Sequence, residues 1–214
     1  MIKQSERLNS VEEYYFSKKL REVSNMIQSG ESVINMAIGS PDLFPSVKVV
    51  DEIKNSLSDS FAHKYQSYQG LPELRDAISK FYNKFFGVEL NPSNEVLPLM
   101  GSKEGIMHIS LAFLNSGDEV LIPNPGYPTY LSVTKLVEAS PVFYNLSEEN
   151  SWFPNLLELE NKDLSKVKLM WINYPHMPTG ASANFDQFEK LLEFAKTNNI
   201  LLINDNPYSF ILND

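Results

Sequence analysis

The sequence contains no cysteine, and this absence excludes a thiol nucleophile, a disulfide framework and any cysteine-bound metal or iron–sulfur cluster. Histidine is nearly as scarce. His63, His108 and His176 lie far apart in the sequence, which argues against a histidine-rich metal site. We therefore expect a protein that works without a bound metal.

Basic residues are outnumbered, with 18 Lys and Arg against 27 Asp and Glu and a net charge of −9. No segment gathers positive charge into a block, so general electrostatic binding to nucleic acid is disfavoured. The sequence also lacks an apolar run of about 18 residues that could span a membrane, and its N-terminus has no apolar signal-peptide core. We expect a soluble, cytoplasmic protein.

The composition is otherwise that of a globular protein, with 43% hydrophobic and 21% charged residues in a chain of 214. Helical and short apolar segments alternate along it. Apolar spacing predicts helices over 11–28, 46–57, 71–86, 102–114, 127–138 and 184–197, a short helical turn over 156–160, and strands over 95–100, 119–123, 141–145, 167–173 and 200–204. The almost continuously apolar strands are typical of a sheet covered on both faces. This pattern predicts an α/β fold, a three-layer sandwich around a mostly parallel sheet.

Ligands of such sheets bind beyond the carboxyl ends of the strands, and two of the predicted strands end in segments rich in glycine or proline. In Met100-Gly101-Ser102-Lys103-Glu104 a helix starts directly after a strand, where free N–H groups bind a phosphate well. An ordinary turn with a serine cap explains the same residues. In Pro123-Asn124-Pro125-Gly126-Tyr127-Pro128 the prolines stiffen a loop and fix an aromatic ring that can stack on a flat cofactor, although a tight loop alone accounts for them.

Two further strand ends carry polar or rigid residues. The segment Asn173-Tyr174-Pro175-His176-Met177-Pro178-Thr179-Gly180 has a fixed, irregular backbone, which either shapes a site or only closes a loop. In Asn204-Asp205-Asn206-Pro207-Tyr208 an aspartate ends a buried strand, where it needs a cationic partner or hydrogen-bond donors. A helix-capping role for this aspartate remains open.

Together and in this order, these segments resemble the class I/II aminotransferases, which are fold type I enzymes dependent on pyridoxal 5′-phosphate. The resemblance runs from about residue 33 to residue 208 and includes Tyr65-Gln66-Ser67-Tyr68-Gln69-Gly70-Leu71-Pro72-Glu73-Leu74-Arg75, which looks like the family's Tyr-x-x-x-x-Gly-Leu-x-x-Leu-Arg segment. It implies transfer of an amino group between an amino acid and a 2-oxo acid, as a cytoplasmic biosynthetic enzyme. No membrane or nucleic-acid partner is implied.

The resemblance also implies roles for single residues. Ser102 and Lys103 would hold the cofactor phosphate through their backbone N–H groups, and Tyr127 would stack on the pyridine ring. Asp205 would pair with the ring nitrogen and keep it protonated, which makes the ring an electron sink. Tyr208 would donate a hydrogen bond to the 3-oxygen of the ring.

Three positions lie earlier in the chain. Tyr65 would reach the cofactor phosphate of a partner subunit, since sites of this family lie at a homodimer interface. Gly39 resembles the family glycine whose backbone lies near the substrate carboxylate. Arg75 matches the family segment, but we interpret it as half of a structural ion pair rather than as a ligand.

One residue inside the motifs departs from the family, which usually has Asn-Pro-Thr-Gly where this chain has Met177-Pro178-Thr179-Gly180. A thioether cannot donate the hydrogen bond that the asparagine gives to the 3-oxygen. We keep Met177 as a position of the site. Either His176 or Asn173 compensates, or Tyr208 acts alone.

The Schiff-base lysine of the family follows the Asp-x-x-Tyr segment by a few tens of residues, and no lysine follows Lys196 here. We expect it beyond residue 214, in a Ser-rich turn, together with the family's phosphate and substrate arginines. On this interpretation residues 1–45 belong to a small domain, and residues 46–214 form a large, cofactor-binding domain cut at its C-terminal side. A lyase or decarboxylase of the same fold and a non-catalytic relative that binds a phosphate ligand or a partner remain alternatives.

Overall fold

The computed structural model describes residues 2–36, 38–39 and 42–211. The chain divides into two compact units, one formed by Met1–Glu12 with Gly101–Asp214 and the other by Glu13–Met100. The boundary between residues 45 and 46 remains a prediction about domains. Within the described ranges, every helix is too short or too polar to cross a membrane.

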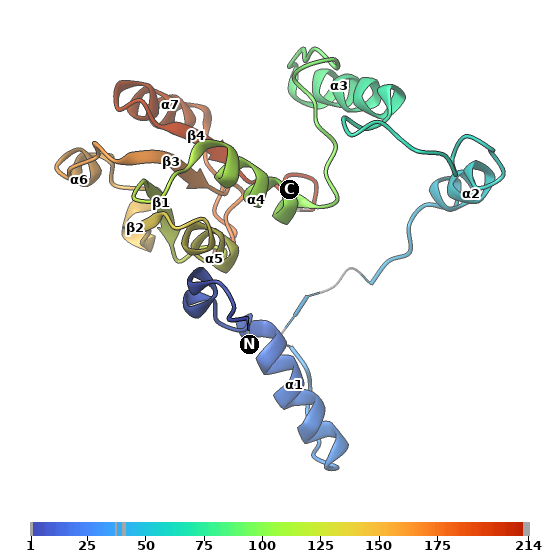
Figure 1. The fold of residues 1–214 in the computed structure, drawn as a ribbon, viewed down its shortest axis with the longest axis horizontal. Coiled ribbons are helices and arrows are strands. Elements are labelled where there is room, and N and C mark those ends of the chain that lie inside the picture. The colour runs from blue at the N-terminus through green and yellow to red at the C-terminus, as the bar shows by residue number, and fades with distance from the viewer. Residues whose placement is uncertain (1, 37, 40–41, 212–214) are drawn as a thin grey trace. The chain divides into compact units, whose positions relative to one another are not determined.

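The first unit is built on four parallel strands in the order β2-β1-β3-β4 (Figure 1). The strands are β1 (Glu119–Asn124), β2 (Ser140–Asn145), β3 (Val167–Ile172) and β4 (Leu201–Asn204). Each begins and ends within one residue of its predicted range. The alternation of helices and apolar strands thus predicted a parallel sheet correctly.

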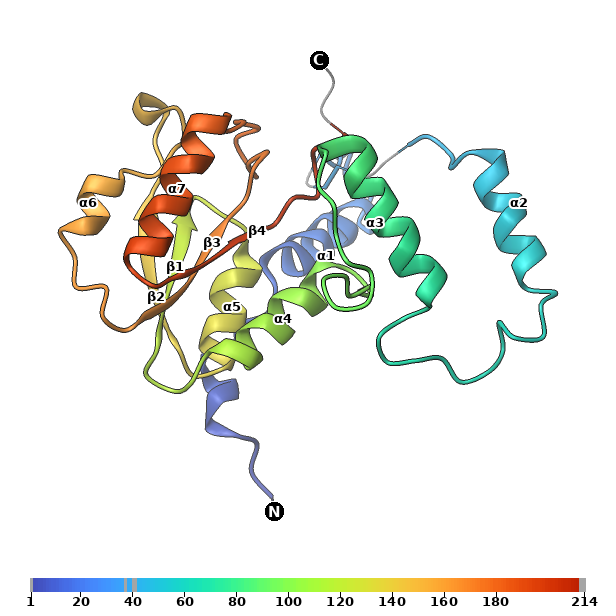
Figure 2. The same cartoon turned by 90° about the horizontal axis from the view of Figure 1, so that it is seen from above.

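Helices α4 (Ser102–Phe113) and α5 (Pro128–Leu136) cover one face of the sheet. The short helix α6 (Leu156–Glu160) and α7 (Phe185–Thr197) cover the other (Figure 2). Successive side chains of a strand point to opposite faces, so each strand feeds two cores. Toward α4 and α5 point Val120, Ile122, Leu169 and Trp171, and toward α6 and α7 point Leu121, Met170 and Ile172. The predicted three-layer sandwich is confirmed.

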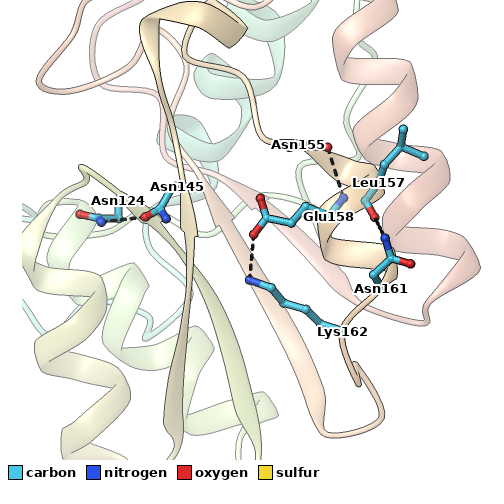
Figure 3. Close-up of polar contacts among 7 residues, drawn as sticks. All are labelled: Asn124, Asn145, Asn155, Leu157, Glu158, Asn161 and Lys162. Carbon is cyan, nitrogen blue, oxygen red and sulfur yellow. Dashed lines mark hydrogen bonds and ion pairs between the residues drawn. The ribbon is translucent and has the colours of Figure 1, made fainter.

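Asparagine side chains organise the connections around α6 (Figure 3). Asn155 caps the helix by accepting a hydrogen bond from the Glu158 backbone N–H at 3.2 Å. Asn161 closes its end by donating to the Leu157 carbonyl at 2.9 Å, and Glu158 pairs with Lys162 across one turn at 3.5 Å. These contacts stabilise both ends of a helix of only five residues, whose buried residue is Leu159.

Helix α7 begins with a capping box. The Asn184 side chain accepts from the Gln187 N–H, and the Gln187 side chain accepts from the Asn184 N–H, both at 2.9 Å. We expect Asn184→Ala to lower the free energy of unfolding by about 1 kcal/mol, because the Gln187 backbone N–H loses its side-chain acceptor.

Urea unfolding of the complete protein measures this change. Asn184→Ser is the matched control, since serine also caps helices, and it should keep most of the stability. Equal losses for the two variants would contradict a capping role.

The N-terminal residues of the first unit add a 3-10 helix, η1 (Glu6–Ser10), that contacts α5. Arg7 lies 3.7 Å from Glu138, just after α5, and both side chains are about half exposed, so this ion pair contributes little. A second 3-10 turn, η2 (Glu148–Asn150), follows β2.

The second unit contains α1 (Tyr15–Gln28), α2 (Val47–Ser56) and α3 (Pro72–Phe86), close to their predicted ranges. Helix α3 starts with proline and ends at Gly87, whose φ of 66° lies in the left-handed region that glycine tolerates. Arg75 on this helix donates to the carbonyls of Pro92 and Ser93 at 3.0 and 3.3 Å. Within the described ranges, Arg75 makes these backbone contacts in place of the predicted ion pair.

The segment 95–100 was predicted as a strand, and the structure gives it no regular conformation. A strand is stabilised by pairing with a neighbouring edge, and the pairings of the described residues involve only β1 to β4. Its apolar composition indicated a strand, but composition alone supplies no partner.

Candidate active site

A cavity of about 160 Å³ opens at the carboxyl ends of the strands in the first unit. It is lined by Ser102, Tyr127, Tyr130, Asn173, Met177, Asp205, Pro207 and Tyr208. Asn173 follows β3 directly and Asp205 follows β4, while Tyr127 lies in the loop after β1. The volume is below the range of about 300–1,000 Å³ typical of sites that enclose a drug-sized ligand. The described residues therefore form one wall of a site at the expected edge of the sheet.

The N-terminus of α4 borders this cavity. Gly101 has a φ of 97°, which lies in the region that favours glycine, and the helix starts at Ser102 without a side-chain cap. Such a helix start directs backbone N–H groups and the positive end of the helix dipole outward. The Lys103 ammonium lies 5.9 Å from the centre of the Tyr127 ring. This end of the cavity is thus suited to an anion.

Tyr127 is held by the loop that precedes it. A Cβ atom on Gly126 would lie 2.5 Å from the Pro123 carbonyl oxygen, so the close turn needs glycine. Pro128 begins α5 immediately after Tyr127 and adds rigidity. The half-buried Tyr127 ring packs edge-on against Tyr130, with centroids 5.6 Å apart. The cavity therefore has a fixed aromatic wall.

Asp205 is anchored through both its backbone and its side chain. Its N–H donates to the Ile172 carbonyl at 2.9 Å, its carbonyl accepts from the Asn173 amide, and its Oδ2 accepts from the Tyr130 hydroxyl at 2.8 Å. Burial raises the pKa of the Asp205 carboxyl, and the hydrogen bond from Tyr130 opposes that rise. A partly desolvated carboxylate with free acceptor capacity attracts a cationic N–H group.

The loop after β3 is shaped by two side chains that the sequence offered as substitutes for the missing asparagine. Asn173 lines the cavity, and its Oδ1 accepts from the Met177 N–H at 2.7 Å. His176 turns its Nδ1 toward the Thr179 hydroxyl at 2.8 Å and is buried. Burial lowers the pKa of His176, and the Pro125 backbone partly offsets this effect. Of the two residues, only Asn173 lies in this cavity wall.

The predicted site residues divide between the two units. Ser102, Tyr127, Met177, Asp205 and Tyr208 line the cavity together. Tyr65 and Gly39 belong to the second unit, and both are exposed there. Their roles remain predictions.

Sequence reasoning overlooked Tyr130. Its hydroxyl reaches a carboxylate 75 positions further along the chain, and no local pattern indicates such a contact. One signal was present: Tyr130 follows Tyr127 by three residues, so the start of a helix there places both rings on one face.

A parallel α/β sheet with a helix N-terminus, an aromatic ring and a carboxylate at one edge defines an α/β protein whose cavity is suited to a flat, phosphate-bearing ligand. Within that class the family is clear. Residues 31–213 match the family described as Aminotransferase class I and II, and the chain belongs to it. Members of this family depend on pyridoxal 5′-phosphate. The resemblance drawn from the motifs is therefore confirmed.

Individual relatives of this chain are also named as aminotransferases. The chain is 41% identical over 213 residues to the LL-diaminopimelate aminotransferase of Dehalococcoides mccartyi, covering 100% of this chain and 55% of the relative. It is 38% identical to the enzyme of the same name from Aquifex aeolicus, covering 99% and 54%. Among solved structures, an alanine aminotransferase from Pyrococcus furiosus superposes with a TM-score of 0.91 at 29% identity, over 99% of this chain and 54% of that one. The chain spans about half the length of the curated relatives it matches.

Proposed function

We propose that the complete protein is a pyridoxal-phosphate-dependent aminotransferase and that these residues supply most of its cofactor-binding wall. The observation that carries this proposal is the grouping of Ser102, Tyr127 and Asp205 around one cavity. These residues offer an anion site, a flat aromatic surface and a carboxylate, and pyridoxal phosphate needs each of the three. The donor set thus fits the cofactor.

When bound, the cofactor supplies an electron sink for the electron pair left by a broken bond at the α-carbon of an amino acid. The residues of this chain hold the cofactor in position. The first turn of α4 at Ser102 holds the phosphate, and Tyr127 limits the tilt of the ring. The Asp205 carboxylate accepts the N–H of the ring nitrogen and favours its protonated form.

Met177 is the position at which this site differs from the usual family motif. Its side chain lines the cavity and cannot donate a hydrogen bond to the 3-oxygen. Tyr208, which lines the same cavity, is the hydroxyl that we assign to this oxygen. The Asn173 amide already donates to the Asp205 carbonyl and accepts from the Met177 N–H, so it acts mainly on the shape of the loop.

The substrates follow from the relatives. We propose an amino acid as donor and a 2-oxo acid as acceptor, with LL-diaminopimelate as the first donor to test, because relatives 38–41% identical carry that name. A homodimer, with Tyr65 reaching the partner's cofactor and Gly39 near the substrate carboxylate, and a cytoplasmic location belong to the same proposal.

The test uses the complete protein that the gene encodes. After addition of pyridoxal phosphate, we expect a yellow protein that moves the amino group of LL-diaminopimelate to 2-oxoglutarate, measured as glutamate. Cofactor binding without transfer to any 2-oxo acid would favour the non-catalytic alternative. Loss of carbon dioxide or a side-chain group from the amino acid, with no acceptor added, would favour a decarboxylase or lyase. Failure to bind the cofactor would overturn the proposal.

The aromatic wall gives a prediction about affinity. We expect Tyr127→Ala to weaken pyridoxal phosphate binding about tenfold, because the stacking surface is lost. Fluorescence quenching of the protein during a cofactor titration measures the dissociation constant. Tyr127→Phe keeps the ring and should bind within about twofold of the unmodified protein. An equally large loss in Tyr127→Phe would show that the hydroxyl, rather than stacking, is important.

A further inference from the structure

The contact between Tyr130 and Asp205 joins the first turn of α5 to the end of β4. The Tyr130 hydroxyl donates to Asp205 Oδ2 at 2.8 Å, and both side chains line the cavity. The family resemblance gave Asp205 a role and gave Tyr130 none. The function of this buried hydroxyl, which donates to the carboxylate of the site, is therefore still to be assigned.

The Tyr130 side chain is held in place by the aromatic rings around it. Its side chain has no solvent exposure, and its ring stacks on Trp171 with centroids 5.1 Å apart and an angle of 7° between the planes. The Tyr127 ring packs against it at 83°. Because a change of rotamer would break both aromatic contacts, the hydroxyl is confined to one position.

The charge state of Asp205 depends on this hydroxyl. Burial raises the pKa of the Asp205 carboxyl, whereas the hydrogen bond from Tyr130 lowers it. Burial and the nearby carboxylate raise the pKa of Tyr130, so its hydroxyl stays protonated and remains a donor. Among the described residues, the other titratable side chains around the cavity are Tyr127 in the loop before α5, Tyr208 after β4 and Lys103 from α4, whose ammonium lies 5.9 Å from the Tyr127 ring centre.

We propose that Tyr130 is a positioning residue that acts through Asp205. Its hydroxyl keeps the carboxylate ionised and turned toward the cavity, ready to pair with the ring nitrogen of pyridoxal phosphate. The bond occupies one lone pair of Oδ2 and leaves Oδ1 to accept from the cofactor. This inference rests on the proposed function.

The experiment compares Tyr130→Phe with Tyr144→Phe in the complete protein. Tyr144 is an equally suitable buried tyrosine, because its hydroxyl donates to the Trp171 carbonyl at 2.6 Å and it packs in the core on the α6 and α7 side of the sheet. The dissociation constant of pyridoxal phosphate is measured by fluorescence quenching from pH 5 to pH 9 for each variant.

Removing the hydroxyl takes away a bond that favours the anion, so the pKa of Asp205 rises in Tyr130→Phe. As the pH falls, the anion is then lost earlier, and we expect the acid-side loss of affinity to move up by about one pH unit. Tyr144→Phe should leave the profile in place. In an Asp205→Asn background, Tyr130→Phe should change nothing further, because the group through which it acts is gone.

An unchanged profile in Tyr130→Phe, the same shift in Tyr144→Phe, or a full effect in the Asp205→Asn background would each overturn the inference. If Tyr130→Phe does not fold, 3,5-difluorotyrosine at position 130 keeps the shape of the ring and donates more strongly. It should move the profile to lower pH, and no shift would overturn the inference. A complete protein that never binds the cofactor would overturn the proposed function as well. Normal binding with an unmoved profile would overturn only the role of Tyr130.

Discussion

Asp205→Ala in the complete protein should slow transamination by about three orders of magnitude while leaving part of the cofactor bound. The carboxylate follows β4 and is held in the cavity by bonds from its own backbone and from Tyr130. Without the Asp205 carboxylate, the protonated form of the cofactor's ring nitrogen loses its anionic partner. The ring then withdraws electrons from the substrate less strongly. The anion site at α4 and the Tyr127 ring remain, so binding falls less than turnover.

Single-turnover rates with a saturating amino acid measure this loss, and cofactor content is read from the absorbance. Asp205→Asn separates charge from shape and should fall nearly as far as Asp205→Ala. Asp163→Ala is the control for removal of an exposed carboxylate, since Asp163 accepts from the Ser165 N–H in a surface loop outside the cavity wall. Turnover of Asp205→Ala within threefold of the unmodified protein would remove Asp205 from the proposed reaction.

Trp171→Ala should give the largest loss of stability among single substitutions in the sheet, about 3–5 kcal/mol in the free energy of unfolding. Trp171 is 1% exposed and lies in β3. Its side chain packs on the α4 and α5 side of the sheet and stacks on the Tyr130 ring of α5. Its removal opens a cavity beneath the residue that positions Asp205. The affinity for pyridoxal phosphate should fall together with the stability.

The urea midpoint of the cofactor-free protein measures the effect. The indole N–H has no hydrogen-bond partner in the described part of the chain, so Trp171→Phe loses only volume and should cost clearly less than Trp171→Ala. Leu157→Ala is the surface control, because Leu157 is 73% exposed on α6, and it should change stability by less than about 0.5 kcal/mol. A loss of similar size in the control would show that the protein tolerates no truncation, and the argument from burial would fail.

The layers of the fold were readable from local signals, and the site was readable only in part. Apolar runs such as the one at β3 predicted strands because both faces of that strand are covered, so that Lys168 is the single polar residue in an otherwise apolar run. The segment 95–100 is also mainly apolar, but it pairs with no strand among the residues that the structure describes, so the same signal failed there. Strand formation depends on a neighbour that local sequence does not specify.

The same limit explains what was found and missed at the cavity. Asp205 and Tyr127 were predictable because Asp205 directly follows β4 and Tyr127 lies in the short loop after β1, and strand ends meet at one edge of a parallel sheet. Tyr130 was not, because its meaning comes from a hydroxyl contact across 75 positions. Asn173 was considered only as a substitute donor, while its structural work is to bind the Met177 N–H and the Asp205 carbonyl.

That work of Asn173 has a consequence for how this site can change over evolutionary time. The backbone at position 177 is held by its own N–H, and the loop is closed further on by a hydrogen bond from the Gly180 N–H to the His176 carbonyl at 2.7 Å. None of these bonds uses the side chain of Met177. A single codon change there can therefore add or remove a donor facing the cavity while the scaffold around it persists. The conformation of the loop therefore does not depend on the side chain at position 177, and this side chain can change the chemistry of the cavity without changing the backbone.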